Sequence, residues 1–169
     1  ADMPGDGLQD QVLVRSGMIA YWPGLGGGRF GPPVVMENAP VLDTAGGFAL
    51  DRILLADLDG AGTADLILLG EGEVRIWTNE AGNGWSAPRI LSGLPMIDTQ
   101  STVEVADIMA DGRLSLVWTE VRPGRIATWQ SLPLSGAVPP GLMRELRNGM
   151  GRCDRLEYGH SAQHYLRDQ

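Results

Sequence analysis

The sequence predicts an all-β chain of two to three β-propeller blades, each with four short antiparallel strands in about 50–55 residues, plus a C-terminal β-hairpin segment. Three observations lead to this fold class. Segments of the chain recur at a nearly constant spacing, and each copy holds short apolar runs separated by turn residues. Glycine is abundant, with 24 residues beside 11 prolines, which favours many short strands over long helices.

The repeat is the strongest signal. The first two copies align without a gap at an offset of 55 residues. The matching pairs are Gly5 with Gly60, Asp10 with Asp65, Gly17 with Gly72, Trp22 with Trp77 and Pro33 with Pro88. Because glycines, aspartates and tryptophans coincide in one register, the match indicates a structural repeat.

A third copy follows at an offset of 50 residues, where Asp107 aligns with Asp57 and Gly112 with Gly62. Two extra residues then bring Trp129 onto the position of Trp77. The predicted repeats cover about 1–55, 56–105 and 106–140 of a partial propeller, and 141–169 is expected to be a hairpin and tail that lead to the next domain of a longer parent protein.

Each copy is predicted to form hairpins that are joined by glycine-rich bends. The expected hairpin strands are 11–15 with 18–22, 66–69 with 73–77, and 114–119 with 125–129. A further strand is expected near Val34 or Ile90, and a last one at 52–56 or 102–106 runs into the next aspartate loop. A β-solenoid or a β-sandwich is the alternative architecture, but solenoid coils are shorter and a sandwich does not explain the repeat.

The tail predicts one more hairpin, 142–147 with 152–158, across the turn residues Asn148 and Gly149. His160 and His164 lie four residues apart, but the surrounding sequence does not favour a helix, so no zinc site is expected there.

The loop from Asp57 to Asp65 carries aspartates at alternate positions among glycines. Oxygen ligands in such a pattern suit Ca²⁺. The expected ligands are the carboxylates of Asp57, Asp59 and Asp65 with main-chain or hydroxyl oxygens of Ala61 and Thr63. The alternative is a tight turn in which aspartate side chains cap backbone amides without a metal.

The other two loops keep only part of this pattern. The first retains Asp2, Asp6 and Asp10 but has proline at the position of Asp59, and the third has methionine and serine at the positions of Asp59 and Asp65. A calcium site is therefore predicted for the second loop ahead of the first, and no other cofactor is expected.

Aromatic residues also recur in the repeat. They form either an exposed set of carbohydrate-binding platforms or blade-to-blade packing, and a large flat side chain at a fixed repeat position favours packing. The residues concerned are Trp22, Trp77, Trp129, Phe30, Trp85 and Trp118.

Charge and motifs exclude several function classes. The net charge of −8 is opposite to that of a nucleic-acid binder. No apolar run is long enough to span a bilayer, and no signal peptide is visible. Cys153 lacks the context of an activated nucleophile, and no nucleotide-binding or hydrolase motif occurs, so no enzymatic activity is expected.

The aspartate loop and the apolar strand after it resemble the FG-GAP/VCBS repeats of integrin-like propellers. Residues 30–34, 55–67 and 79–86, with 148–151 and 158–168 of the tail, resemble the mid-region of the B component of insecticidal toxin complexes (Tc toxins), which plasmid virulence B (SpvB-like) proteins share. The resemblance implies a non-catalytic propeller module of a secreted, extracellular toxin or virulence protein, which docks to a translocation component and gates cargo passage.

The expected partners are toxin-complex subunits or the remaining blades of the parent chain. Since two to three blades leave apolar faces uncovered, isolated copies are expected to self-associate. The alternative function is an independent calcium-dependent adhesin-like or carbohydrate-binding propeller fragment.

Overall fold

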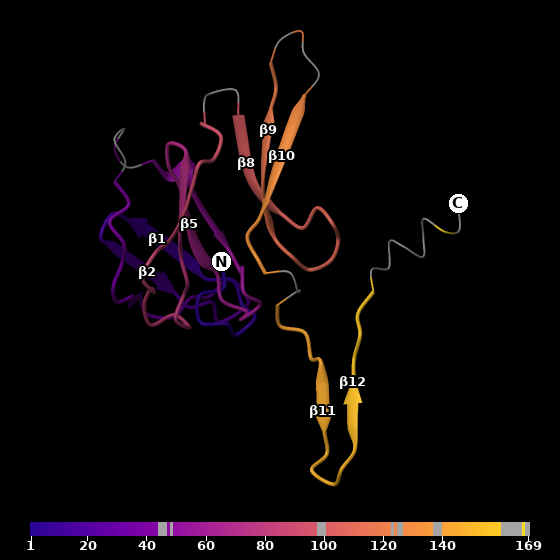
Figure 1. Cartoon of the computed structure of the whole chain (residues 1–169). Coiled ribbons are helices and arrows are strands. Elements are labelled where there is room, and N and C mark those ends of the chain that lie inside the picture. The colour runs from indigo at the N-terminus through magenta and orange to yellow at the C-terminus, as the bar shows by residue number, and fades with distance from the viewer. Residues whose placement is uncertain are drawn as a thin grey trace.

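The computed structural model describes residues 1–43, 47, 49–97, 101–122, 124, 127–136, 140–159 and 167. Their strands form antiparallel sheets that confirm the all-β, propeller-like fold class (Figure 1). The first sheet contains β1 (Gln11–Arg15), β2 (Met18–Trp22) and β3 (Val34–Val35). The second contains β4 (Ile53–Ala56), β5 (Asp65–Leu69), β6 (Glu73–Trp77) and β7 (Arg89–Ser92) in this order, after a 3-10 turn at Leu50–Arg52. The third contains β8 (Ser101–Ala106), β9 (Ser115–Glu120) and β10 (Thr128–Pro133), and a hairpin pairs β11 (Glu145–Arg147) with β12 (Cys153–Arg155).

In the second and third copies, the strand before the aspartate loop pairs with the strand after it. β4 pairs with β5 across the second loop, and β8 pairs with β9 across the third. In the described residues, the second sheet alone has all four strands: the first has no counterpart of β4, and the third has no counterpart of β7.

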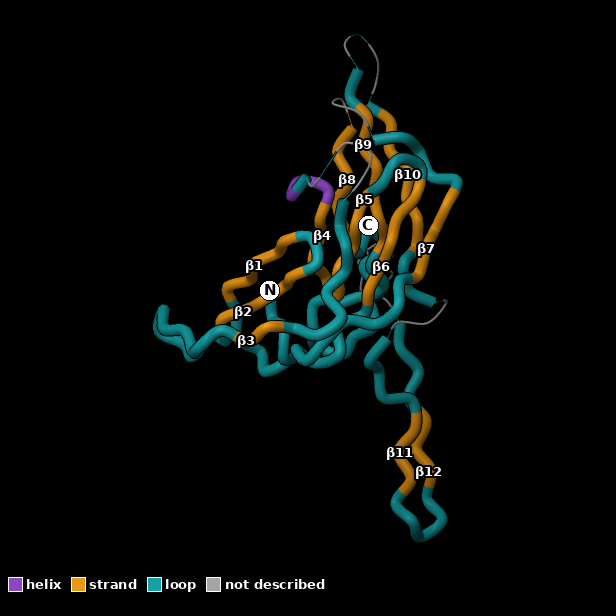
Figure 2. Tube along the Cα trace, turned by 90° about the vertical axis from the view of Figure 1, so that its left-hand side faces the viewer, coloured by secondary structure: helices purple, strands orange, loops and turns teal. Residues whose placement is uncertain are grey.

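The second sheet lies between the other two, which the two views show from different sides (Figures 1 and 2). Every residue of β5 is buried because both of its faces are covered. Leu66 and Leu68 pack against the first sheet, and Ile67 and Leu69 pack against the third. This explains why the sequence of β5 is a continuous apolar run and not an alternation of apolar and polar residues.

The predicted match of Trp129 with Trp77 is wrong. Leu116 of β9 pairs with Leu132 of β10 in the same way that Leu66 of β5 pairs with Trp77 of β6. Leu132 therefore holds the position of Trp77, and the third hairpin contains five extra residues in place of the predicted two. Hairpin loops tolerate insertions at small cost, so a tryptophan is a poor guide to register there.

The packing prediction for the aromatic residues is confirmed for Trp77, Trp85 and Trp118, all of which are buried. Trp22 is half-buried. Phe30 and Trp129 are 47% and 64% exposed in this chain, so packing of these two side chains stays a prediction. Trp129 lies on the face of the third sheet that points away from the second, and Phe30 lies in a bend outside the strands.

The hairpin of β11 and β12 stands apart from the three stacked sheets (Figures 1 and 2). Its Asn-Gly turn is confirmed: the Asn148 side chain accepts hydrogen bonds from the amides of Met150 and Arg152, at 2.8 and 3.1 Å. His160 and His164 lie outside the described residues. In the described part of the chain, no helix has the length and apolar character that a membrane span requires.

Candidate functional site

The aspartate loops form the candidate site, and their carboxylates accept hydrogen bonds from the loop backbone. Asp57 accepts bonds from the amides of Gly60, Ala61 and Gly62 at 2.8–3.1 Å. Asp59 accepts a second bond from Ala61, at 3.0 Å. Asp2 in the first loop and Asp107 in the third accept amide bonds in the same way as Asp57. Asp6 and Asp111 hold the position of Ala61 and cap a later amide, that of Leu8 or of Arg113. Aspartate in these positions fixes a tight turn because it replaces water at the turn amides.

The last aspartate of the loop has a different role. Asp65 is 1% exposed and accepts bonds from the amides of Leu58, at 3.2 Å, and Asn79, at 2.9 Å. Its carboxylate thus joins the start of the loop to the residue that follows the β5–β6 hairpin. In the first copy, Asp10 makes the same link to Met3 and Gly24, at 2.7 and 2.8 Å.

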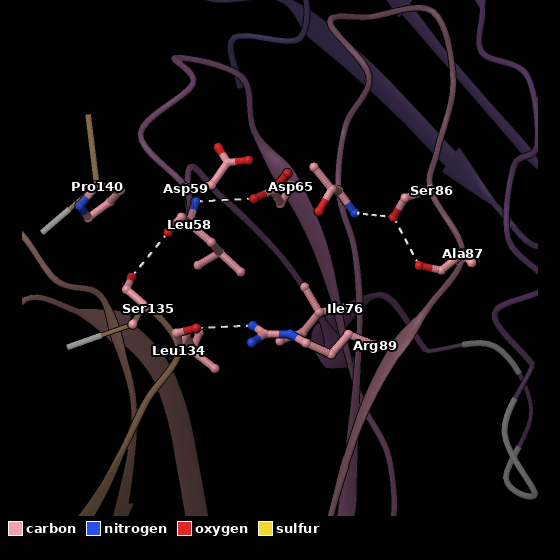
Figure 3. A pocket seen from close by; sticks show the side chains of 12 residues that line it. Leu58, Asp59, Asp65, Ile76, Ser86, Ala87, Arg89, Leu134, Ser135 and Pro140 are labelled. Atoms are coloured by element: carbon pink, nitrogen blue, oxygen red, sulfur yellow. Dashed lines mark hydrogen bonds between the residues drawn. The ribbon is translucent and has the colours of Figure 1, made fainter. Parts of the chain in front are cut away.

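Side chains also link the first and second loops to the sheet that follows each of them. The Asn79 amide nitrogen donates to the Met3 carbonyl at 2.9 Å. Met3 and Leu58 hold the same position in their loops, and the Leu58 carbonyl accepts a bond from the Ser135 hydroxyl at 3.1 Å (Figure 3). At both interfaces between sheets, the acceptor is therefore the carbonyl at the same position of the repeat, although the donor side chains differ.

Glycine is required where the loops meet. Gly5 has φ 82°, and a Cβ there would lie 3.1 Å from the Thr63 side chain of the next loop. Gly60 has φ 72°, and a Cβ there would lie 3.1 Å from the backbone of Pro140. Both positions combine a left-handed backbone with close contact, so the glycines kept by the repeat allow successive segments to pack.

The carboxylates predicted as calcium ligands accept hydrogen bonds from backbone amides. Asp57 and Asp59 are used as amide acceptors, and Asp65 is buried on two further amides. The Thr63 hydroxyl is buried and has no hydrogen-bond partner. Among the residues that the structure describes, no three His, Cys, Asp or Glu side chains gather in a possible metal site. The calcium site thus stays a prediction from the sequence, and the contacts favour the amide-capping alternative.

Excess Ca²⁺ is expected to leave the thermal midpoint of unfolding unchanged, because the carboxylates are already satisfied by backbone amides. A ligand that binds only the folded state raises this midpoint, so scanning calorimetry with Ca²⁺ and with chelator measures the effect directly. A rise that disappears in Asp57→Ala, but persists in the control Glu71→Gln, would instead establish a cation site in the second loop.

Burial raises the pKa of Asp65 above its usual value of 3.8. The amides of Asn79 and Leu58 oppose this shift because they stabilise the carboxylate, while the charges of Asp59 and Asp57 add to it. A folded-state pKa above the unfolded value means that the folded chain binds the proton more tightly. Asp65 therefore adds stability below about pH 3.8, and this contribution is lost as the pH rises through its folded pKa.

Asp65→Asn is expected to reduce the pH dependence of the free energy of unfolding, because asparagine does not titrate. The wild-type chain should have the larger free energy of unfolding, and the difference from the variant should be greatest at acid pH. This difference should shrink as the pH rises. Urea unfolding between about pH 3 and pH 7 measures it. A difference that grows with pH would contradict the raised pKa.

A cavity of about 300 Å³ opens beside the second loop. Its polar lining includes Asp59, Asp65, Arg89, Ser86 and Ser135 (Figure 3). Arg89 donates to the Leu134 carbonyl at 3.0 Å and so helps to hold the segment after β10 against the second sheet. Sequence reasoning missed Arg89 and Ser135, because neither belongs to a motif and only the stacking of sheets brings them together.

The comparisons with known proteins agree with this architecture. Residues 57–118 match the FG-GAP-like repeat family. The chain is similar over 99% of its length to part of the Tc holotoxin pore of Photorhabdus luminescens, with 32% sequence identity and a TM-score of 0.80. The crystal structure of TcdB2-TccC3 without its hypervariable C-terminal region matches equally well, with 32% identity, a TM-score of 0.79 and the same 99% coverage. The chain is a Tc toxin B-component-like region.

This Tc toxin B-component-like region covers 8% of each of those toxin chains. An Agrocybe aegerita lectin that recognises non-reducing terminal N-acetylglucosamine also has a similar fold, with 26% identity and a TM-score of 0.53 over 70% of this chain and 31% of the lectin. No curated protein sequence matches the Tc toxin B-component-like region.

Proposed function

We propose that this chain is a non-catalytic structural module of a secreted, extracellular toxin complex or virulence protein. The observation that carries the proposal is the similarity to Tc toxin structures over 99% of the chain. The polar groups of the loops support it, because they fix turns and tie sheets together. Both faces of the middle sheet are likewise used for packing.

In this proposal the module docks to a translocation component and contributes to gating the passage of cargo. The docking surface is the set of aspartate loops, which carry exposed carboxylates such as those of Asp6 and Asp59. The first two loops contact each other through the hydrogen bond from the Ala64 amide to the Asp2 carbonyl. With a net charge of −8, the chain fits a partner surface that is basic. Charge complementarity of this kind accelerates association and makes binding sensitive to salt.

The test is binding of the chain to an immobilised Tc toxin translocation component at low and high salt. Asp6→Asn with Asp59→Asn removes two charges but keeps the amide-capping geometry, so binding should weaken without loss of fold. Glu71→Gln, in the turn between β5 and β6, is the matched control and should bind normally. Absence of binding by the wild-type chain would overturn docking. Gating is tested separately, by cargo release from a holotoxin that carries this chain in place of its own region.

Carbohydrate binding is a second candidate, because the chain resembles the Agrocybe aegerita lectin and exposes the aromatic faces of Phe30 and Trp129. Aromatic rings stack on the apolar faces of sugars. Titration calorimetry with N-acetylglucosamine, with and without Ca²⁺, tests it. Heat of binding that is lost in Trp129→Ala would support this candidate, and no heat at millimolar sugar would exclude it.

A further inference from the structure

The cavity beside the second aspartate loop lies inside the repeat, because its lining comes from the second copy and from the segment that follows β10. Its floor is apolar: Leu58, Ile76 and Leu134 are buried and belong to one core cluster. A volume of about 300 Å³ falls at the lower end of the range of small-molecule sites. The cavity is therefore large enough for a small ligand.

The equivalent space between the first and second sheets is filled by a side chain. Tyr21 of β2 and Ile76 of β6 hold the same position, because each pairs with the same position of the next strand. The Tyr21 hydroxyl lies 2.5 Å from the point where a Cβ on Gly82 would be, and the Pro4 Cα lies 3.4 Å from that point. The ring thus reaches from the first loop to the turn after β6. Isoleucine has no such ring, and the cavity stands in its place.

The lining of the cavity is more polar than the equivalent surface of the first copy. Loss of the ring alone would leave an apolar void, which costs stability. Four lining positions instead carry polar side chains in the second copy, and such groups around an apolar floor are typical of ligand sites. Asp59, Thr78, Ser86 and Arg89 stand where the first copy has Pro4, Pro23, Gly31 and Val34.

Two of these side chains carry opposite charges with capacity for a ligand. One carboxylate oxygen of Asp59 accepts the Ala61 amide, which leaves the other oxygen for a cation. The Arg89 guanidinium has five N–H donors and gives one to the Leu134 carbonyl, at 3.0 Å. Figure 3 shows Asp59 and Arg89 on opposite sides of the pocket. Asp65 also lines it, but both of its oxygens already accept backbone amides.

We propose that this cavity binds a zwitterion whose ammonium and carboxylate groups are separated by a short methylene stem. The ammonium group contacts Asp59, and the carboxylate accepts N–H bonds from Arg89. The stem packs on the apolar floor. A compound with one charge would leave either Asp59 or Arg89 without its partner. Free ω-amino acids and a C-terminal lysine of another protein both carry this pair of charges.

Titration calorimetry of the whole chain with 6-aminohexanoate, up to about 10 mM, tests the proposal. The wild-type chain should bind this compound. Hexylamine and hexanoate each lack one of the two charges and should bind at least about tenfold more weakly. Nα-acetyl-lysine separates the two sources. Equal binding assigns the site to a C-terminal lysine, and binding at least about tenfold weaker assigns it to a free ω-amino acid.

Ile76→Tyr is the most direct variant, because it puts the residue of the first copy into the second. Its ring should fill the cavity and abolish binding, while the thermal midpoint of unfolding should not fall. Asp59→Asn and Arg89→Gln should each weaken binding at least about tenfold. Because Arg89 also holds Leu134, the midpoint of that variant is measured alongside. Asp6→Asn, an exposed carboxylate of the first loop, is the control and should bind normally.

Three results would overturn the proposal: no binding by the wild-type chain, equal binding of hexylamine or hexanoate, or undiminished binding by folded Ile76→Tyr. The site is independent of the proposed docking function, although Asp59 belongs to both. Ile76→Tyr leaves every charge of the docking surface in place. This variant should therefore lose the zwitterion and still bind the translocation component, so the failure of one proposal is distinguishable from the failure of the other.

Discussion

Asp65→Ala is expected to be strongly destabilising, with a loss of about 2–6 kcal/mol in the free energy of unfolding. The substitution leaves the amides of Leu58 and Asn79 without their acceptor at a site that is 1% exposed. A buried amide without a partner costs about 1–3 kcal/mol, and here two are affected. Urea unfolding at neutral pH, followed by circular dichroism, measures the loss.

Asp59→Ala is the matched control for this prediction. Asp59 belongs to the same loop, but it is exposed and caps only Ala61, which Asp57 also caps. Its loss should therefore cost less than about 1 kcal/mol. Equal effects of the two substitutions would show that the buried link to Asn79 does not hold the loop in place.

Trp85→Ala should lower the free energy of unfolding by about 3–5 kcal/mol, as is typical of a buried tryptophan. Trp85 is 2% exposed and packs in the core between the first and second sheets. Its indole nitrogen has no hydrogen-bond partner, so the expected loss comes from apolar contact and from the cavity left behind. Because the variant removes a fluorophore, unfolding should be followed by circular dichroism.

Trp129→Ala provides the comparison for Trp85→Ala. Trp129 is 64% exposed, so its truncation in the monomeric chain should change the free energy of unfolding by no more than about 0.5 kcal/mol. The measurement is made at low protein concentration, where association does not contribute. A loss as large as that of Trp85→Ala would mean that Trp129 is covered within one chain.

Most strands could be predicted from the sequence because turn residues and short apolar runs determine where they begin and end. The predicted strands 11–15, 18–22 and 73–77 agree with β1, β2 and β6. Turn residues mark the ends of these hairpins, and the repeat supplies a second copy of most elements. The stacking of sheets also followed from the repeat, since apolar positions shared by several copies must be covered by neighbouring copies.

Features that depend on contacts between sheets were not predictable in this way. The longer third hairpin moved Leu132, and not Trp129, onto the position of Trp77. The aspartate pattern did not separate a cation site from an amide-capping turn, because both need carboxylates and glycines at the same spacing. Asn79 and Ser135 carried no motif, and their bonds to Met3 and Leu58 exist only because the loops stack.

Those two side-chain bonds have a consequence for how the chain unfolds. A sheet that separates from its neighbour must break a polar bond at the loop and expose an apolar face in the same step. Nearest-neighbour coupling of this kind makes the three sheets open together, as in other repeat proteins. The β11–β12 hairpin stands outside this coupling. Hydrogen exchange should therefore show two classes of amide: fast ones in the hairpin, and slow ones in β5 that exchange only by global unfolding.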